Sequence, residues 1–142
     1  MKNFKTIFII TLVLDIVQFI PLFLALSGGE MKAFLVADIG VDGLAESAPG
    51  LAVLDMMLFV FAFIALGYLL SIIYALRLTN IDSKKTAAIL LGIFHLTWAL
   101  PDFINLISGS GGHAPIVLMI FSLISIVGLF YVSQNGVAKS AE

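Results

Sequence analysis

Four ionisable side chains interrupt the long apolar segments of this chain, and they are the residues best placed to do chemistry there. They are Asp15, Asp55, His95 and Asp102. A charged group inside a bilayer is costly, so it usually faces a partner or a wet cavity and marks a functional site. We therefore predict that these side chains turn inward, away from the acyl chains.

Asp15 and His95 are expected to lie at the same depth. Asp15 follows Lys5 by ten residues, and His95 follows Lys85 by ten residues. At about 1.5 Å per residue, both lie roughly 15 Å inside the membrane boundary, near the midplane. A carboxylate and an imidazole at one depth can pair through a charge-assisted hydrogen bond, which offsets much of their burial cost. We predict direct or water-bridged contact between them.

Further polar residues extend this pair toward the opposite membrane surface. Trp98, Asp102 and Asn105 continue from His95 at spacings of three, four and three, so all four share one helical face. Asp55 is expected at the depth of Asp102, where two close carboxylates would share a proton. The resulting prediction is a polar cleft that opens outward and is lined, from mouth to floor, by Asp55, Asp102, Asn105, Trp98, Gln18, Asp15 and His95.

The elements that position these residues are membrane helices. Of the 142 residues, 61% are hydrophobic and only 11% are charged, whereas soluble domains carry about 25% charged residues. Because a span needs about 20 apolar residues, residues 1–142 form a single transmembrane domain. The sequence predicts an all-α, polytopic four-helix bundle with helices over 6–26, 51–76, 86–107 and 115–133. The first segment is too long for a signal peptide and contains Asp15, so we interpret it as a membrane helix.

The basic residues predict the orientation. Six of them fall on one side of the spans and only Lys32 on the other; the six are Lys2, Lys5, Arg77, Lys84, Lys85 and Lys139. Basic loops stay cytoplasmic, which predicts a multi-pass protein of the cell membrane with both termini inside. The outer loop, 28–50, is then outside, and Met31–Ala37 is expected to form a short helix on the membrane surface.

A weak internal repeat relates the two halves of the chain. A shift of 80 residues lays Lys5-Thr6 on Lys85-Thr86 and Pro21 on Pro101; a shift of 62 relates helices two and four less well. Two repeated hairpins would place a site where they meet, while two unrelated hairpins of similar composition are the alternative. Each proline should kink its helix.

Several classes of function are excluded or left without a signal. The chain has no cysteine, which excludes disulfides and thiolate chemistry. No metal site is predicted, because a single membrane histidine cannot hold a metal by itself. A net charge of −2 without a basic run excludes nucleic acid as a partner. No cofactor can be named.

Three functions remain. The first is binding of a lipophilic or amphipathic small molecule, with isomerisation as an extension, because an apolar pocket with a few polar groups suits such ligands. The second is an accessory role in a homo-oligomer or a larger membrane complex, in which case the polar residues only fix helix register. Helix four would then face lipid or a partner, since its polar side chains are only Ser122, Ser125 and Ser133. The third is proton or cation transfer along the polar line.

One segment adds a resemblance to the first of these functions. Asp15, Gln18, Pro21 and Phe23 resemble the acid–Gln–Pro segment of sterol isomerases and sigma-2-type receptors of the EXPERA group. In that group the segment lies on another helix, with different spacing and with Glu as the acid, so the resemblance extends only to this stretch.

Overall fold

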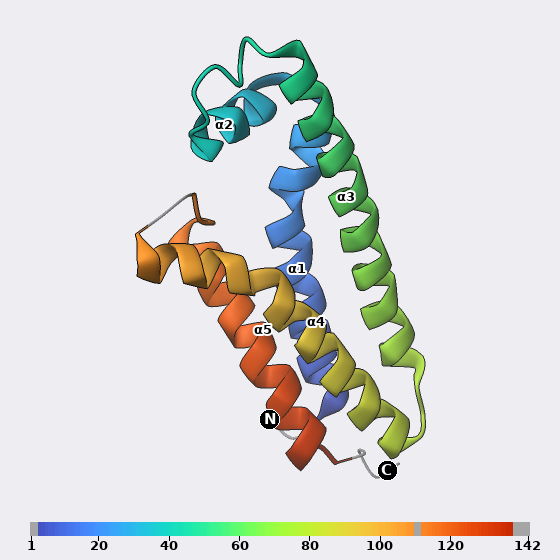
Figure 1. Ribbon diagram of the computed structural model, residues 1–142. Helices are drawn as coiled ribbons and strands as arrows, with labels where there is room; N and C mark the ends of the chain where they lie inside the picture. Colours follow the sequence, from blue (N-terminus) through green and yellow to red (C-terminus); the bar gives the residue numbers. More distant parts are fainter. Residues whose placement is uncertain (1–2, 110–111, 138–142) are drawn as a thin grey trace.

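The computed structural model describes residues 3–109 and 112–137, and these form five helices and no strand (Figure 1). The helices are α1 (Phe4–Leu26), α2 (Gly29–Ile39), α3 (Ala48–Arg77), α4 (Ile81–Ser108) and α5 (Ile116–Asn135). All except α2 are long and apolar enough to cross a membrane. At most 39% of the most apolar stretch of each is buried, so most apolar side chains face outward, as lipid requires. The prediction of four spans is confirmed.

Polar capping residues extend two of the predicted helices at their starts. Ser47 caps α3 by accepting a hydrogen bond from the backbone N–H of Gly50, and Asn80 caps α4 by accepting from the N–H of Asp82 and Ser83. Such caps satisfy N–H groups that have no partner within the helix. The helices therefore begin three and five residues before the predicted starts, 51 and 86.

The helices pack around α1, which lies between α3 and α5, while α4 packs along α5 (Figure 1). The described chain ends meet, because Asn3 and Val137 form an isolated bridge. We call this side of the bundle the termini end and the opposite side, where α2 lies, the α2 end. The fully buried apolar side chains gather toward the termini end: Phe4, Phe8, Ile72, Leu129 and Val132.

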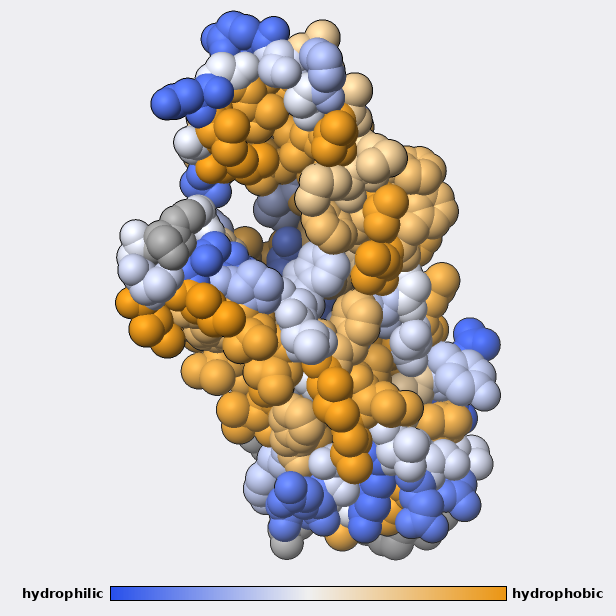
Figure 2. Space-filling model, in the orientation of Figure 1, coloured by the Kyte–Doolittle hydropathy of each residue, from blue (hydrophilic) through white to orange (hydrophobic). Residues whose placement is uncertain are grey.

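The bundle is splayed toward the α2 end. Pro101 lies inside α4, as Pro21 lies inside α1, and α4 bends away from α3 in the half that carries Pro101 (Figure 1). Figure 2 shows an opening between the α2 lobe and the turn that joins α4 to α5, with hydrophilic surface at its back. A cavity of about 410 Å³ lies there, lined by Asp38, Ile39, Gly40, Gly112 and His113.

The segment between the first two membrane helices forms a longer helix than Met31–Ala37. Helix α2 has 11 residues, none of them buried, and ends at Gly40, whose φ of 67° is readily adopted by glycine. It packs against α1. Lys32 of α2 also forms an ion pair with Asp55 of α3. The expectation of a helix in this segment is confirmed, and it is tied to two membrane helices.

Candidate functional site

Asp15 and His95 meet inside the bundle. Asp15 of α1 is 0% exposed and His95 of α4 is 3% exposed. Oδ1 of Asp15 lies 3.4 Å from Nδ1 of His95, a close polar contact that is longer than the roughly 2.7–3.2 Å of an N–H···O hydrogen bond. The predicted approach of these two residues is confirmed.

Tyr68 of α3 completes this contact and was missed in the sequence. Its hydroxyl lies 3.1 Å from Nδ1 of His95 and donates a hydrogen bond of 3.2 Å to the backbone carbonyl of Leu91. A phenol has one hydrogen. That hydrogen can go either to Leu91 or to Nδ1 of His95. When it goes to Leu91, Tyr68 accepts from Nδ1 of His95, and Nε2 of a neutral imidazole is then an acceptor.

A signal for Tyr68 was present in the sequence. It precedes Arg77 by nine residues, so the depth argument used for Asp15 and His95 places it at the same level. A tyrosine buried in an apolar helix also needs a partner for its hydroxyl.

Gln18 connects Asp15 to α5. Its side-chain amide nitrogen donates to Oδ1 of Asp15 over 3.2 Å, and its carbonyl oxygen accepts from the hydroxyl of Ser122 over 2.6 Å. We call Asp15, Gln18, Tyr68, His95 and Ser122 the polar centre. It draws on all four long helices, as an internal site between two hairpins would.

The three serines of helix four turn toward the interior of the bundle. Ser122, Ser125 and Ser133 are 5%, 1% and 5% exposed, respectively. Small residues let helices approach closely in a membrane, and a hydroxyl that faces inward can bond within the bundle. The serine face of α5 therefore turns toward its neighbours, together with apolar residues such as Leu129 and Val132.

Four buried polar atoms have no hydrogen-bonding partner among the described residues: Oγ1 of Thr11, Oδ2 of Asp15, Nε2 of His95 and Oγ of Ser125. Helices α1 and α5 run antiparallel (Figure 1), and the Gln18–Ser122 bond sets their register. Asp15 therefore lies at the level of Ser125. Two of the four atoms, Oδ2 of Asp15 and Nε2 of His95, belong to the polar centre.

Aromatic rings lie beside the polar centre, toward the α2 end. Trp98 packs edge-on against Phe19 and Phe61, with ring centroids 5.6 and 5.8 Å apart, and stacks on Phe94. Phe19 also meets Tyr68 edge-on. Trp98 thus adjoins the polar centre through its ring contacts. We call Phe19, Phe61, Phe94 and Trp98 the aromatic cluster.

Two of the residues predicted at the mouth of the cleft, Asp102 and Asn105, form hydrogen bonds with backbone groups that follow α4. Asp102 accepts a 2.8 Å hydrogen bond from the backbone N–H of Ala114, and Asn105 donates a 2.7 Å hydrogen bond to the carbonyl of Gly112. Both bonds secure the turn between α4 and α5.

Asp55 is exposed and pairs with Lys32. The structure therefore gives Asp55 and Asp102 different partners and does not bring them together as a pair that shares a proton. One reason is that α4 bends away from α3 at this level. The other is that Lys32 of α2 supplies a cation for Asp55, which was not expected from the sequence.

Residues 3–109 and 112–137 contain no group of three or more His, Cys, Asp or Glu side chains that could hold a metal ion. Comparison of the chain with protein-family models, with curated proteins and with solved structures finds no match. The chemistry of the polar centre must therefore be inferred from its geometry.

Proposed function

We propose that this multi-pass membrane protein binds a lipophilic molecule whose polar head carries a hydrogen-bond donor, above all an ammonium group. The observation that supports this is a pair of buried atoms in the polar centre, which are both acceptors when Asp15 is ionised and His95 carries its proton on Nδ1. Oδ2 of Asp15 and Nε2 of His95 are buried and have no partner among the described residues. Acceptors shielded from water are stabilised strongly by a donor, and most strongly by a charged one.

The surroundings suit the rest of such a ligand. The aromatic cluster presents ring faces and edges next to the acceptors, and a cation is attracted to aromatic faces. An apolar body would pack against Trp98, which is partly exposed. Nε2 of His95 would also serve as the proton acceptor if the bound molecule were isomerised.

The proposed orientation places the α2 end outside the cell. Four basic residues of the described chain, Lys5, Arg77, Lys84 and Lys85, belong to the termini end, and Lys32 belongs to α2. This asymmetry favours a cytoplasmic termini end. Lys2 and Lys139, which also entered the prediction, lie outside the described residues, as do Ser110 and Gly111 of the turn after α4. A ligand would then enter from the outer leaflet, on the side of the opening in Figure 2.

The internal repeat remains part of the proposal. Its two units would be the hairpins α1–α3 and α4–α5. Asp15 and Tyr68 come from the first unit, and His95 and Ser122 come from the second. A site built from both units agrees with two repeated hairpins that meet along an axis normal to the membrane.

The test is binding of a matched pair of probes to the full-length protein in lipid nanodiscs. Dodecylamine carries an ammonium group, and dodecane has the same tail without a donor. We expect dodecylamine alone to raise the temperature of unfolding. Asp15→Asn should weaken its apparent affinity by about 10- to 100-fold, the usual value of a hydrogen bond to a charged group.

Asp42→Asn is the control, because it makes the same chemical change on an exposed loop residue and should bind as the wild type does. Equal binding by the wild type and Asp15→Asn would contradict the proposal. Native mass spectrometry of the gently solubilised protein adds a further outcome, because a stoichiometric partner subunit there, with no small molecule, would favour the accessory role instead.

Proton transfer is the second candidate. The contacts from Tyr68 through His95 and Asp15 to Gln18 and Ser122 form a polar chain across four helices at one level of the bundle. Ionisable chains carry protons in membrane proteins, and a complete path would continue from this level to both surfaces. Reconstituted vesicles containing a pH-sensitive dye would test it. Proton flux that is present in the wild type and lost in Asp15→Asn would favour this function over ligand binding.

A further inference from the structure

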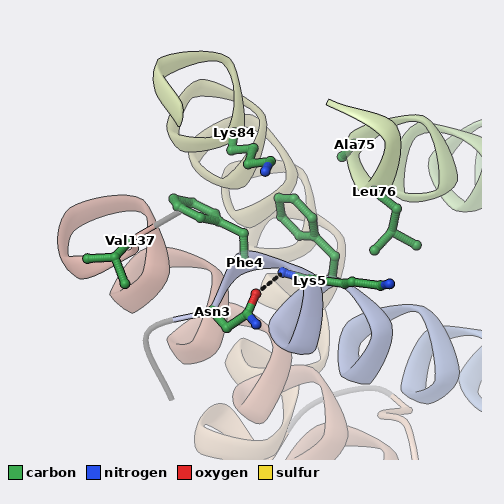
Figure 3. A pocket seen from close by; sticks show the side chains of 8 residues that line it. Asn3, Phe4, Lys5, Ala75, Leu76, Lys84 and Val137 are labelled. Atoms are coloured by element: carbon green, nitrogen blue, oxygen red, sulfur yellow. Dashed lines mark hydrogen bonds between the residues drawn. The ribbon is translucent and has the colours of Figure 1, made fainter. Parts of the chain in front are cut away.

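A second pocket lies at the termini end, remote from the polar centre. It has a volume of about 170 Å³ and is lined by Asn3, Phe4, Lys5, Phe8, Ala75, Leu76, Lys84 and Val137 (Figure 3). The start of α1, the end of α3 and the start of α4 therefore meet around it. The space suits a phosphate-sized group rather than a whole lipid.

Two lysines, Lys5 and Lys84, line the pocket. In the described part of the chain the ion pairs are Lys32–Asp55 and Asp15–His95, so Lys5 and Lys84 have no acidic partner there. Figure 3 shows Lys84 directing its side chain toward the space beside Phe4, while the Lys5 side chain extends away from Lys84 on the side of Leu76. The starts of α1 and α4 line the pocket and add the positive potential of helix N-termini, while the end of α3 adds the negative potential of a C-terminus. Together these groups favour an anion.

The remaining lining is apolar. Phe4 and Phe8 are 2% and 1% exposed, and they form the inner side of the pocket with Ala75. Beyond Leu76, the outer surfaces of the long helices are apolar, as Figure 2 shows above the hydrophilic termini end. A ligand that combines an anionic head with apolar chains would satisfy both kinds of surface.

The pocket lies at the depth of lipid headgroups. Tyr74 of α3 and Tyr131 of α5 are 68% and 43% exposed near the ends of their helices at this side of the bundle. Exposed tyrosines are typical of the interface between membrane and water. This placement favours the phosphate of a lipid over phosphate free in solution.

We propose that the pocket binds the phosphate group of an anionic phospholipid, with Lys5 and Lys84 on the phosphate and the acyl chains running along the outer faces of α3 and α4. This site is independent of the ligand proposed for the polar centre. The bound phosphate would stabilise the packing of the start of α1, the end of α3 and the start of α4 against one another.

The test compares two lipids with the same chains and different net charge. The full-length protein in detergent is titrated with phosphatidylglycerol or phosphatidylcholine, and bound lipid is counted by native mass spectrometry. The wild type should retain phosphatidylglycerol in preference to phosphatidylcholine. A lysine near an anionic membrane surface contributes about fivefold to binding, so Lys5→Gln with Lys84→Gln should weaken the affinity for phosphatidylglycerol roughly 25-fold.

The matched control is Arg77→Gln with Lys85→Gln, which removes the same charge from the termini end without changing a residue that lines the pocket. If both pairs of substitutions weaken binding equally, only the overall surface charge matters and the pocket is not the site. If inorganic phosphate displaces phosphatidylglycerol at equal concentration, the pocket binds free phosphate and the lipid proposal is overturned. Equal binding of phosphatidylglycerol and phosphatidylcholine by the wild type would also overturn the proposal. This outcome is measured without any variant.

Discussion

Replacing Tyr68 by Phe removes one oxygen from the polar centre and leaves the ring in place. The ring stacks on Phe94, with centroids 4.6 Å apart, and this contact is retained in the variant. The lost hydroxyl makes two contacts, at 3.2 Å to the Leu91 carbonyl and 3.1 Å to His95. The substitution therefore isolates the polar contribution of Tyr68.

The size of the effect follows from what remains bonded. Leu91 is inside α4, where its carbonyl can keep an intrahelical hydrogen bond. His95 keeps its 3.4 Å contact with Asp15. Neither partner is left without any contact, so the cost is that of the hydrogen bonds alone. Interhelical hydrogen bonds in membranes contribute about 0.6 kcal/mol on average and about 1.7 kcal/mol at most. We expect Tyr68→Phe to lower the free energy of unfolding by about 1–2 kcal/mol.

Reversible unfolding in mixed micelles with increasing dodecyl sulfate would measure this change. Tyr74→Phe is the control, because it removes the same atom from the same helix at a side chain that is 68% exposed. Its effect should stay within about 0.5 kcal/mol. Equal costs for the two variants would refute the assignment of Tyr68 to a buried polar centre.

Three further predictions use the same assay. The effects of Ser122→Ala and Gln18→Leu on the free energy of unfolding should be coupled by about 0.6–1.7 kcal/mol in a double-mutant cycle. The reason is the 2.6 Å hydrogen bond between the two native side chains. Additive effects would mean that this bond does not join α1 to α5. Gly92→Leu should lower the free energy of unfolding by about 1–3 kcal/mol, because a Cβ added at Gly92 would lie 3.4 Å from the Phe130 ring. Gly67→Leu is the control and should cost nothing, because a Cβ added there would have nothing within 4 Å. Equal costs for the two variants would refute close packing of α4 on α5. Lys32→Met should cost less than about 1 kcal/mol, because its partner Asp55 is 55% exposed; a larger loss would show that this ion pair holds α2 in place.

The four membrane helices and the level of the polar centre could be predicted from the chain alone. Long apolar segments specify helices because the backbone must satisfy its own hydrogen bonds in lipid. Distance along a helix then converts directly into depth, which is why Asp15 and His95 were expected to meet. The capping effects of Ser47 and Asn80 were also written in the sequence, although the predicted starts lay further along the chain.

The direction in which each helix faces was decided only by the tertiary structure. In water, the apolar stripe of a helix identifies its buried side. In lipid, apolar residues are accommodated on every side, so a helix such as α5 carries little information about which face turns inward. Packing against α1 turned Ser122 toward Gln18, and the bend of α4 separated Asp102 from Asp55. Depth is a property of one helix, but the choice of partner depends on several helices packed together.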